Sequence, residues 1–96
     1  MTAAEDRRSF TFLVNPTSGG GAAPGAVVPV ARQLREAGAS VDVTYSPGPH
    51  AMATLVEEAV GRGDVVVSVG GDGMLSSLAG LVATHGGTLG IVPAGR

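Results

Sequence analysis

The chain has 96 residues, of which 44% are hydrophobic and 15% charged, with a formal net charge of −2 and no cysteine. This composition argues against disorder and excludes disulfides and thiolate metal sites. The slightly negative net charge does not favour binding to nucleic acid. No apolar run has the length or position of a signal peptide or a membrane span. We therefore expect a cytoplasmic globular domain without a nucleic-acid partner.

Hydrophobic periodicity predicts alternating strands and helices after a polar N-terminal arm over residues 1–9. The predicted strands, rich in Val, Ile, Leu and Phe, are residues 10–14, 41–45, 65–69 and 88–92. The predicted helices are residues 24–37, 50–61 and 74–84, the first beginning at Pro24 or Val28. Pro29 leaves that start open because proline fits only the first turn, whereas Gly38 is well suited to end the helix.

The order β-α-β-α-β-α-β favours an α/β fold with a mainly parallel sheet between helical layers, a three-layer α/β/α sandwich. Apolar residues at helical spacing predict which helix positions face this sheet. They are Val27, Ala31 and Leu34 in the first helix, Met52, Leu55, Val56, Ala59 and Val60 in the second, and Leu75, Leu78, Ala79 and Val82 in the third.

Ligands of parallel α/β sheets bind outside the carboxyl ends of the strands. Four unusual loops fall at those ends, at residues 15–21, 46–49, 70–73 and 93–96. Their convergence predicts a binding site at this edge of the sheet.

The loop Gly70-Gly71-Asp72-Gly73 follows a buried strand and precedes a helix. Glycines let a backbone approach a bulky anion, and a helix N-terminus offers N–H groups and positive potential to phosphate. Asp72 could bind a hydroxyl or hold a magnesium ion. In the alternative interpretation the loop is only a tight turn in which Asp72 caps the helix, but its position after a strand favours a phosphate site.

The loop Asn15-Pro16-Thr17-Ser18-Gly19 follows the first strand. Its amide and hydroxyls could bind a ribose, a base edge or a phosphate, although an Asx turn is the simpler alternative for this loop taken alone. The glycine loop on the same edge favours binding.

Isolated polar residues add weaker indications. Thr44, at the end of the second strand, could contact a ligand, and Arg96 could meet a phosphate or simply be solvated. His50 could act as a base but is better explained as opening the second helix, and His85 is expected to be exposed. The chain contains no lysine, which excludes a P-loop, and its two histidines are too far apart in sequence to predict a zinc site.

Together these motifs resemble the catalytic domain of the diacylglycerol kinase family, which includes bacterial lipid kinases and sphingosine and ceramide kinases. The segment Leu89-Gly90-Ile91-Val92-Pro93-Ala94-Gly95 adds to the two loops, and the resemblance covers about residues 10–96. The glycine loop alone is shared with NAD kinases and phosphofructokinases, whose nucleotide-binding domains have the same expected fold. Joined to the first loop, it is much more specific.

The resemblance implies an ATP- and Mg²⁺-dependent kinase that phosphorylates a lipid hydroxyl, such as that of diacylglycerol. Asp72 would have the catalytic or magnesium-linked role. The implied nucleotide-binding residues are Asn15, Pro16, Thr17, Ser18, Gly19, Thr44, Gly70, Gly71, Asp72, Gly73, Met74 and Arg96. Two positions depart from the family pattern: Met74 and Ser77 stand where Thr and Glu are usual.

Family members continue beyond the position of Arg96 with a β-rich domain that closes the cleft, supplies much of the lipid site and bears the catalytic base. We therefore expect residues 10–96 to be a truncated, ATP-binding N-terminal half that is inactive alone. Peripheral contact with the inner membrane surface and a homodimer are further expectations. The alternatives are a non-catalytic nucleotide-binding module and a relative of NAD or sugar-phosphate kinases.

Overall fold

The computed structural model describes residues 8–16, 21, 23–45 and 47–93. Over these residues strands and helices alternate, which confirms the predicted order. The elements are β1 (Ser9–Val14), α2 (Ala23–Glu36), β2 (Ser40–Tyr45), α3 (Pro49–Arg62), β3 (Val65–Gly70), α4 (Asp72–His85) and β4 (Thr88–Pro93).

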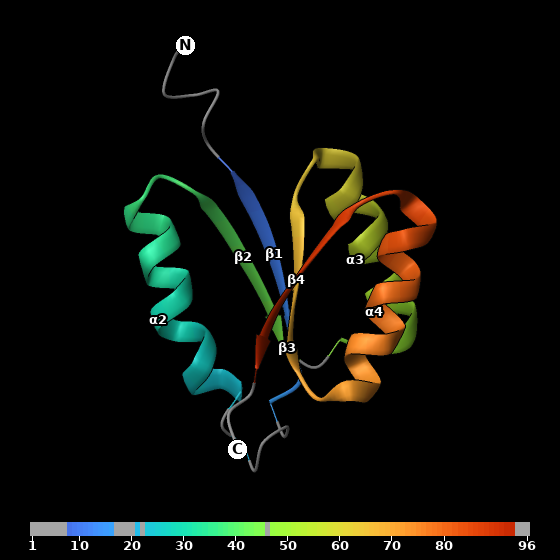
Figure 1. The fold of residues 1–96 in the computed structure, drawn as a ribbon, viewed down its shortest axis with the longest axis horizontal. Helices are drawn as coiled ribbons and strands as arrows, with labels where there is room; N and C mark the ends of the chain where they lie inside the picture. Colours follow the sequence, from blue (N-terminus) through green and yellow to red (C-terminus); the bar gives the residue numbers. More distant parts are fainter. Residues whose placement is uncertain (1–7, 17–20, 22, 46, 94–96) are drawn as a thin grey trace.

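The strands form one parallel sheet in the order β2-β1-β3-β4. Helix α2 covers one face of the sheet, and α3 and α4 lie side by side on the other (Figure 1). The predicted three-layer α/β/α architecture is therefore confirmed. Within the described part of the chain, no helix has the length and apolar character needed to cross a membrane.

Alternate strand residues supply two apolar cores, one on each face of the sheet, as the two-residue repeat of a strand requires. The core under α2 contains Phe12, Val14, Ala23, Val27, Ala31, Val41, Val67 and Val69. The core under α3 and α4 contains Leu13, Val56, Ala59, Val66, Leu78 and Val82. One inward prediction is wrong: Ala79 is exposed, because it lies about 100° around α4 from the buried Leu78.

Helix α2 starts at Ala23 and keeps Pro29 inside it, so a start at Val28 is wrong. Proline cannot donate to the carbonyl four residues earlier, here that of Gly25. Both Gly25 and Pro29 are exposed, so water can take the missing donor's place, while Val27 and Ala31 on the opposite side stay buried.

Gly38 ends α2 as predicted. Its φ of 96° is in the left-handed region, where glycine carries no Cβ penalty. The N–H of Gly38 donates to Arg35 at 3.0 Å and that of Ala39 to Leu34 at 2.9 Å. These are the two bonds of a Schellman motif, and they turn the chain directly into β2.

Candidate active site

The two central strands mark the point where the connections of the sheet diverge. From β1 the chain passes through α2 to β2 on one side, and from β3 it passes through α4 to β4 on the other. The carboxyl ends of β1 and β3 lie together at the lower edge of the sheet in Figure 1. In open α/β sheets such a switch point opens a crevice in which ligands bind.

A backbone hydrogen bond joins the two predicted loops at this crevice. The N–H of Asn15, the first residue after β1, donates to the carbonyl of Val69 at 2.9 Å. Val69 directly precedes the glycine loop, so the structure brings the start of one loop against the start of the other.

A small cavity of about 270 Å³ opens beside this junction, lined by Asn15, Pro47, Met52 and Met74. Asn15 and Met74 were predicted as binding residues, and the structure places them around one space. Pro47 and Met52 were not singled out for binding. The signal for Pro47 was its place in a loop at the carboxyl edge, whereas Met52 carried only the apolar spacing of a core residue.

Helix α4 begins inside the glycine loop. Gly71 is its N-cap, in an extended conformation, and no side chain caps the helix. The first helical bond runs from the N–H of Leu75 to the carbonyl of Gly71 at 3.2 Å. The N–H groups of residues 72–74 therefore have no acceptor within the helix, as an anion-binding helix N-terminus requires.

The alternative role of Asp72 as a helix cap is wrong, because Asp72 is the first residue of α4 and makes no capping bond. Asp72 and Gly73 are both exposed. A Cβ built on Gly73 would meet nothing within 4 Å, so packing among the described residues does not require glycine there. The open space leaves room for a ligand to approach the backbone.

The N-terminus of α3 lies at the same edge of the sheet (Figure 1). Gly48 is its N-cap, Pro49 follows, and again no side chain caps the helix. Two uncapped helix N-termini thus add positive potential at the crevice. His50 lies exposed in the first turn of α3, as predicted, and His85 lies exposed in the last turn of α4.

The remaining predicted residues do not line the small cavity or lie outside the described residues. Thr44 is half-buried on β2, in register with Leu13, and does not line the small cavity. Pro16 is half-buried next to Asn15, and Gly70 ends β3 opposite Pro93. The other four, Thr17, Ser18, Gly19 and Arg96, lie outside the described residues.

The side chains near the crevice limit how a magnesium ion could be held there. No group of three or more His, Cys, Asp or Glu side chains within the described ranges could hold a metal ion. Magnesium in phosphate-transfer sites is commonly held by one or two carboxylates, with substrate phosphates and water completing the shell. Asp72 at the edge of the crevice fits that pattern and does not fit a cage made of protein alone.

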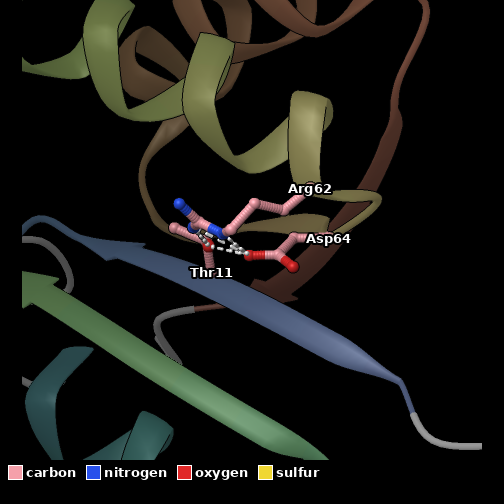
Figure 2. A network of polar contacts seen from close by, with 3 residues as sticks. All are labelled: Thr11, Arg62 and Asp64. Carbon is pink, nitrogen blue, oxygen red and sulfur yellow. Dashed lines mark hydrogen bonds and ion pairs between the residues drawn. The ribbon is translucent and has the colours of Figure 1, made fainter.

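A polar network near the amino ends of β1 and β3, away from the crevice, was not predicted (Figure 2). The hydroxyl of Thr11 donates to Oδ2 of Asp64 at 2.9 Å, and Arg62 donates to the same oxygen through Nη2 at 2.9 Å. Asp64 is only 6% exposed, and a buried carboxylate needs such partners. In the sequence, Asp64 directly precedes an apolar run, and that run gives no indication that Thr11 of β1 is its partner.

The chain is thus a doubly wound α/β domain whose sheet has its switch point between β1 and β3, the place where ligands of such sheets bind. A family model described as "Diacylglycerol kinase catalytic domain" matches residues 9–96. The chain belongs to this family of lipid kinases, which confirms the resemblance inferred from the loops.

Two relatives named "Diacylglycerol kinase" are similar to the chain, from Mycobacterium tuberculosis strains CDC 1551 / Oshkosh and ATCC 25618 / H37Rv. Each is 36% identical over 100 residues, covering 99% of this chain and 32% of the relative. The chain thus spans about a third of the length of these relatives.

Proposed function

We propose that this chain binds Mg²⁺-ATP in the crevice between β1 and β3, as the nucleotide-binding part of a kinase that phosphorylates a lipid hydroxyl such as that of diacylglycerol. The observation that carries the proposal is the uncapped first turn of α4, next to the loop that follows β1. Family membership supports ATP as the phosphate source and a lipid as the acceptor.

In this proposal the free N–H groups of residues 72–74 hold phosphate oxygens. Asp72 would hold a Mg²⁺ ion, which would supply positive charge to neutralise the phosphates. Asn15 orients the nucleotide from the facing loop. Because the chain has no lysine, the backbone N–H groups and the two helix N-termini supply the positive field, aided by Arg96.

Contacts of the nucleotide with Pro16, Thr17, Ser18, Gly19, Thr44, Gly70 and Gly71 complete the proposed site. Positioning and charge neutralisation are the main requirements of phosphoryl transfer, so this set needs no covalent nucleophile. In this proposal, the catalytic base and much of the lipid site come from parts of the kinase other than residues 10–96. We therefore expect no efficient turnover by the chain alone. Its proposed setting is the cytoplasm, with transient contact at the inner membrane surface.

Calorimetry tests the nucleotide site directly. We expect micromolar binding of Mg²⁺-ATP, and Asp72→Ala should weaken it at least about tenfold, the effect of losing one charge-assisted contact. Asp42→Ala is the matched control, because Asp42 is an exposed aspartate on β2 and its loss changes the net charge equally. No binding heat with the unmodified chain, or equal weakening by both variants, would contradict the proposal.

A further inference from the structure

A second and larger cavity lies between α3 and α4, on the side of the sheet away from α2. Its volume is about 620 Å³, and its lining, which we call the α3–α4 groove, includes Pro47, Met52, Ala53, Gly80, Leu81 and Thr84. This volume is within the range of small-molecule sites. The two helices pack together at the sheet through the buried Val56, Leu78 and Val82, whereas the residues that line the groove are half-buried or exposed.

Small residues keep the groove open. A Cβ built on Gly80 would meet nothing within 4 Å, and Ala53 faces it from α3 with a single methyl group. None of the described residues that line the groove is charged. Three hydroxyls, those of Ser76, Ser77 and Thr84, also line the groove, and the proton of Thr84 is already donated to the carbonyl of Gly80 at 2.9 Å. The rest of the lining is apolar, so the groove suits a mainly apolar occupant.

The groove is continuous with the candidate active site. Pro47 and Met52 line both the groove and the smaller cavity that Asn15 and Met74 complete. A molecule lying in the groove would have one end at the carboxyl edge of the sheet, where the phosphates are placed. An occupant with an apolar chain and a polar end matches both regions.

We propose that the α3–α4 groove holds one hydrocarbon chain of the lipid acceptor, with the hydroxyl end of the lipid directed toward the crevice. This inference rests on the proposed function. A membrane surface fits less well, because α3 presents the exposed acids Glu57 and Glu58, which oppose contact with anionic headgroups. Among its described lining residues there is also no cationic side chain to pair with a phosphate group.

The test is an NMR titration of the 96-residue chain with 1,2-dioctanoylglycerol below its aggregation limit, and separately with Mg²⁺-ATP. We expect the lipid to shift the amide signals of Ala53, Gly80 and Thr84, and Mg²⁺-ATP to shift those of residues 70–74. Gly80→Leu should weaken lipid binding roughly tenfold by filling the groove and leave Mg²⁺-ATP binding unchanged.

Gly61→Leu is the matched control, because Gly61 is an exposed helical glycine of α3 whose Cβ would also meet nothing within 4 Å. It should leave both affinities unchanged, and both variants replace glycine by a better helix former. Equal loss of lipid binding in the two variants would overturn the inference, as would shifts outside the groove or equal shifts with octyl glucoside. Normal Mg²⁺-ATP shifts in that case would leave the proposed function standing.

Discussion

The backbone N–H of Asn15 and the carbonyl of Val69 lie 2.9 Å apart, so the loops after β1 and β3 start from one fixed point. The bond uses only main-chain atoms of Asn15. Asn15 also lines the small cavity, and a substitution of its side chain leaves this backbone bond in place.

Asn15→Ala should lower the free energy of unfolding by no more than about 1–2 kcal/mol, the worth of one side-chain hydrogen bond, because the backbone bond to Val69 survives. Affinity for Mg²⁺-ATP should fall about tenfold with the loss of the amide contact. Calorimetry and urea unfolding measure the two effects. An unchanged affinity would show that the amide does not meet the nucleotide.

Met74→Thr should tighten Mg²⁺-ATP binding about threefold to tenfold. The hydroxyl adds a donor at the uncapped first turn of α4, and one added hydrogen bond has this order of effect. Met74 also packs against the core under α3 and α4, so unfolding must be measured alongside binding. Ser77→Thr, which adds only a methyl group one turn further along the exposed side of α4, is the control and should not change affinity.

Thr11→Val should destabilise the fold by about 1–2 kcal/mol. The substitution keeps the shape of the side chain but removes the donor that faces the buried carboxylate of Asp64 at 2.9 Å. Arg62 still holds that oxygen and is itself 52% exposed, which limits the loss. Thr84→Val, at an exposed position, should cost less than about 0.5 kcal/mol. Urea unfolding that ranks the two variants in the reverse order would contradict a structural role for the network.

Gly87→Ala should destabilise the fold by about 1–3 kcal/mol through overpacking. A Cβ at this position would lie 2.5 Å from Cγ2 of Val60 and 3.3 Å from Cγ1 of Val82. Both neighbours are branched and packed in the same core, so neither can move aside freely. Gly61→Ala, in open space, should instead stabilise α3 by about 0.5–1 kcal/mol. Thermal or urea unfolding distinguishes the two signs.

The sequence was sufficient for the architecture because each strand of the predicted sheet is a short aliphatic run between turn residues, as in Val65–Gly70. It was less informative where neighbours decide the outcome. Pro29 is tolerated inside α2 only because its side of the helix is exposed. Ala79 is apolar yet lies outward.

For the candidate site, the loops that carry glycine and asparagine were visible in the sequence, whereas the lining by Pro47 and Met52 was not. Met52 follows the same helical spacing as the core residues of α3, and only its place in the first turn puts it beside Asn15. The pairing of Thr11 with Asp64 joins residues 53 positions apart, and no local pattern encodes such a distance.

The sheet order places β1 and β3 in the interior, each hydrogen-bonded to a strand on both sides. Amide protons of such strands exchange with solvent only when the whole domain opens, whereas those of the edge strands β2 and β4 can exchange through smaller fluctuations. The loops proposed to hold the nucleotide thus follow directly from the strands whose amide protons should exchange most slowly. The α3–α4 groove, in contrast, is lined by half-buried and exposed residues that lie outside these two strands.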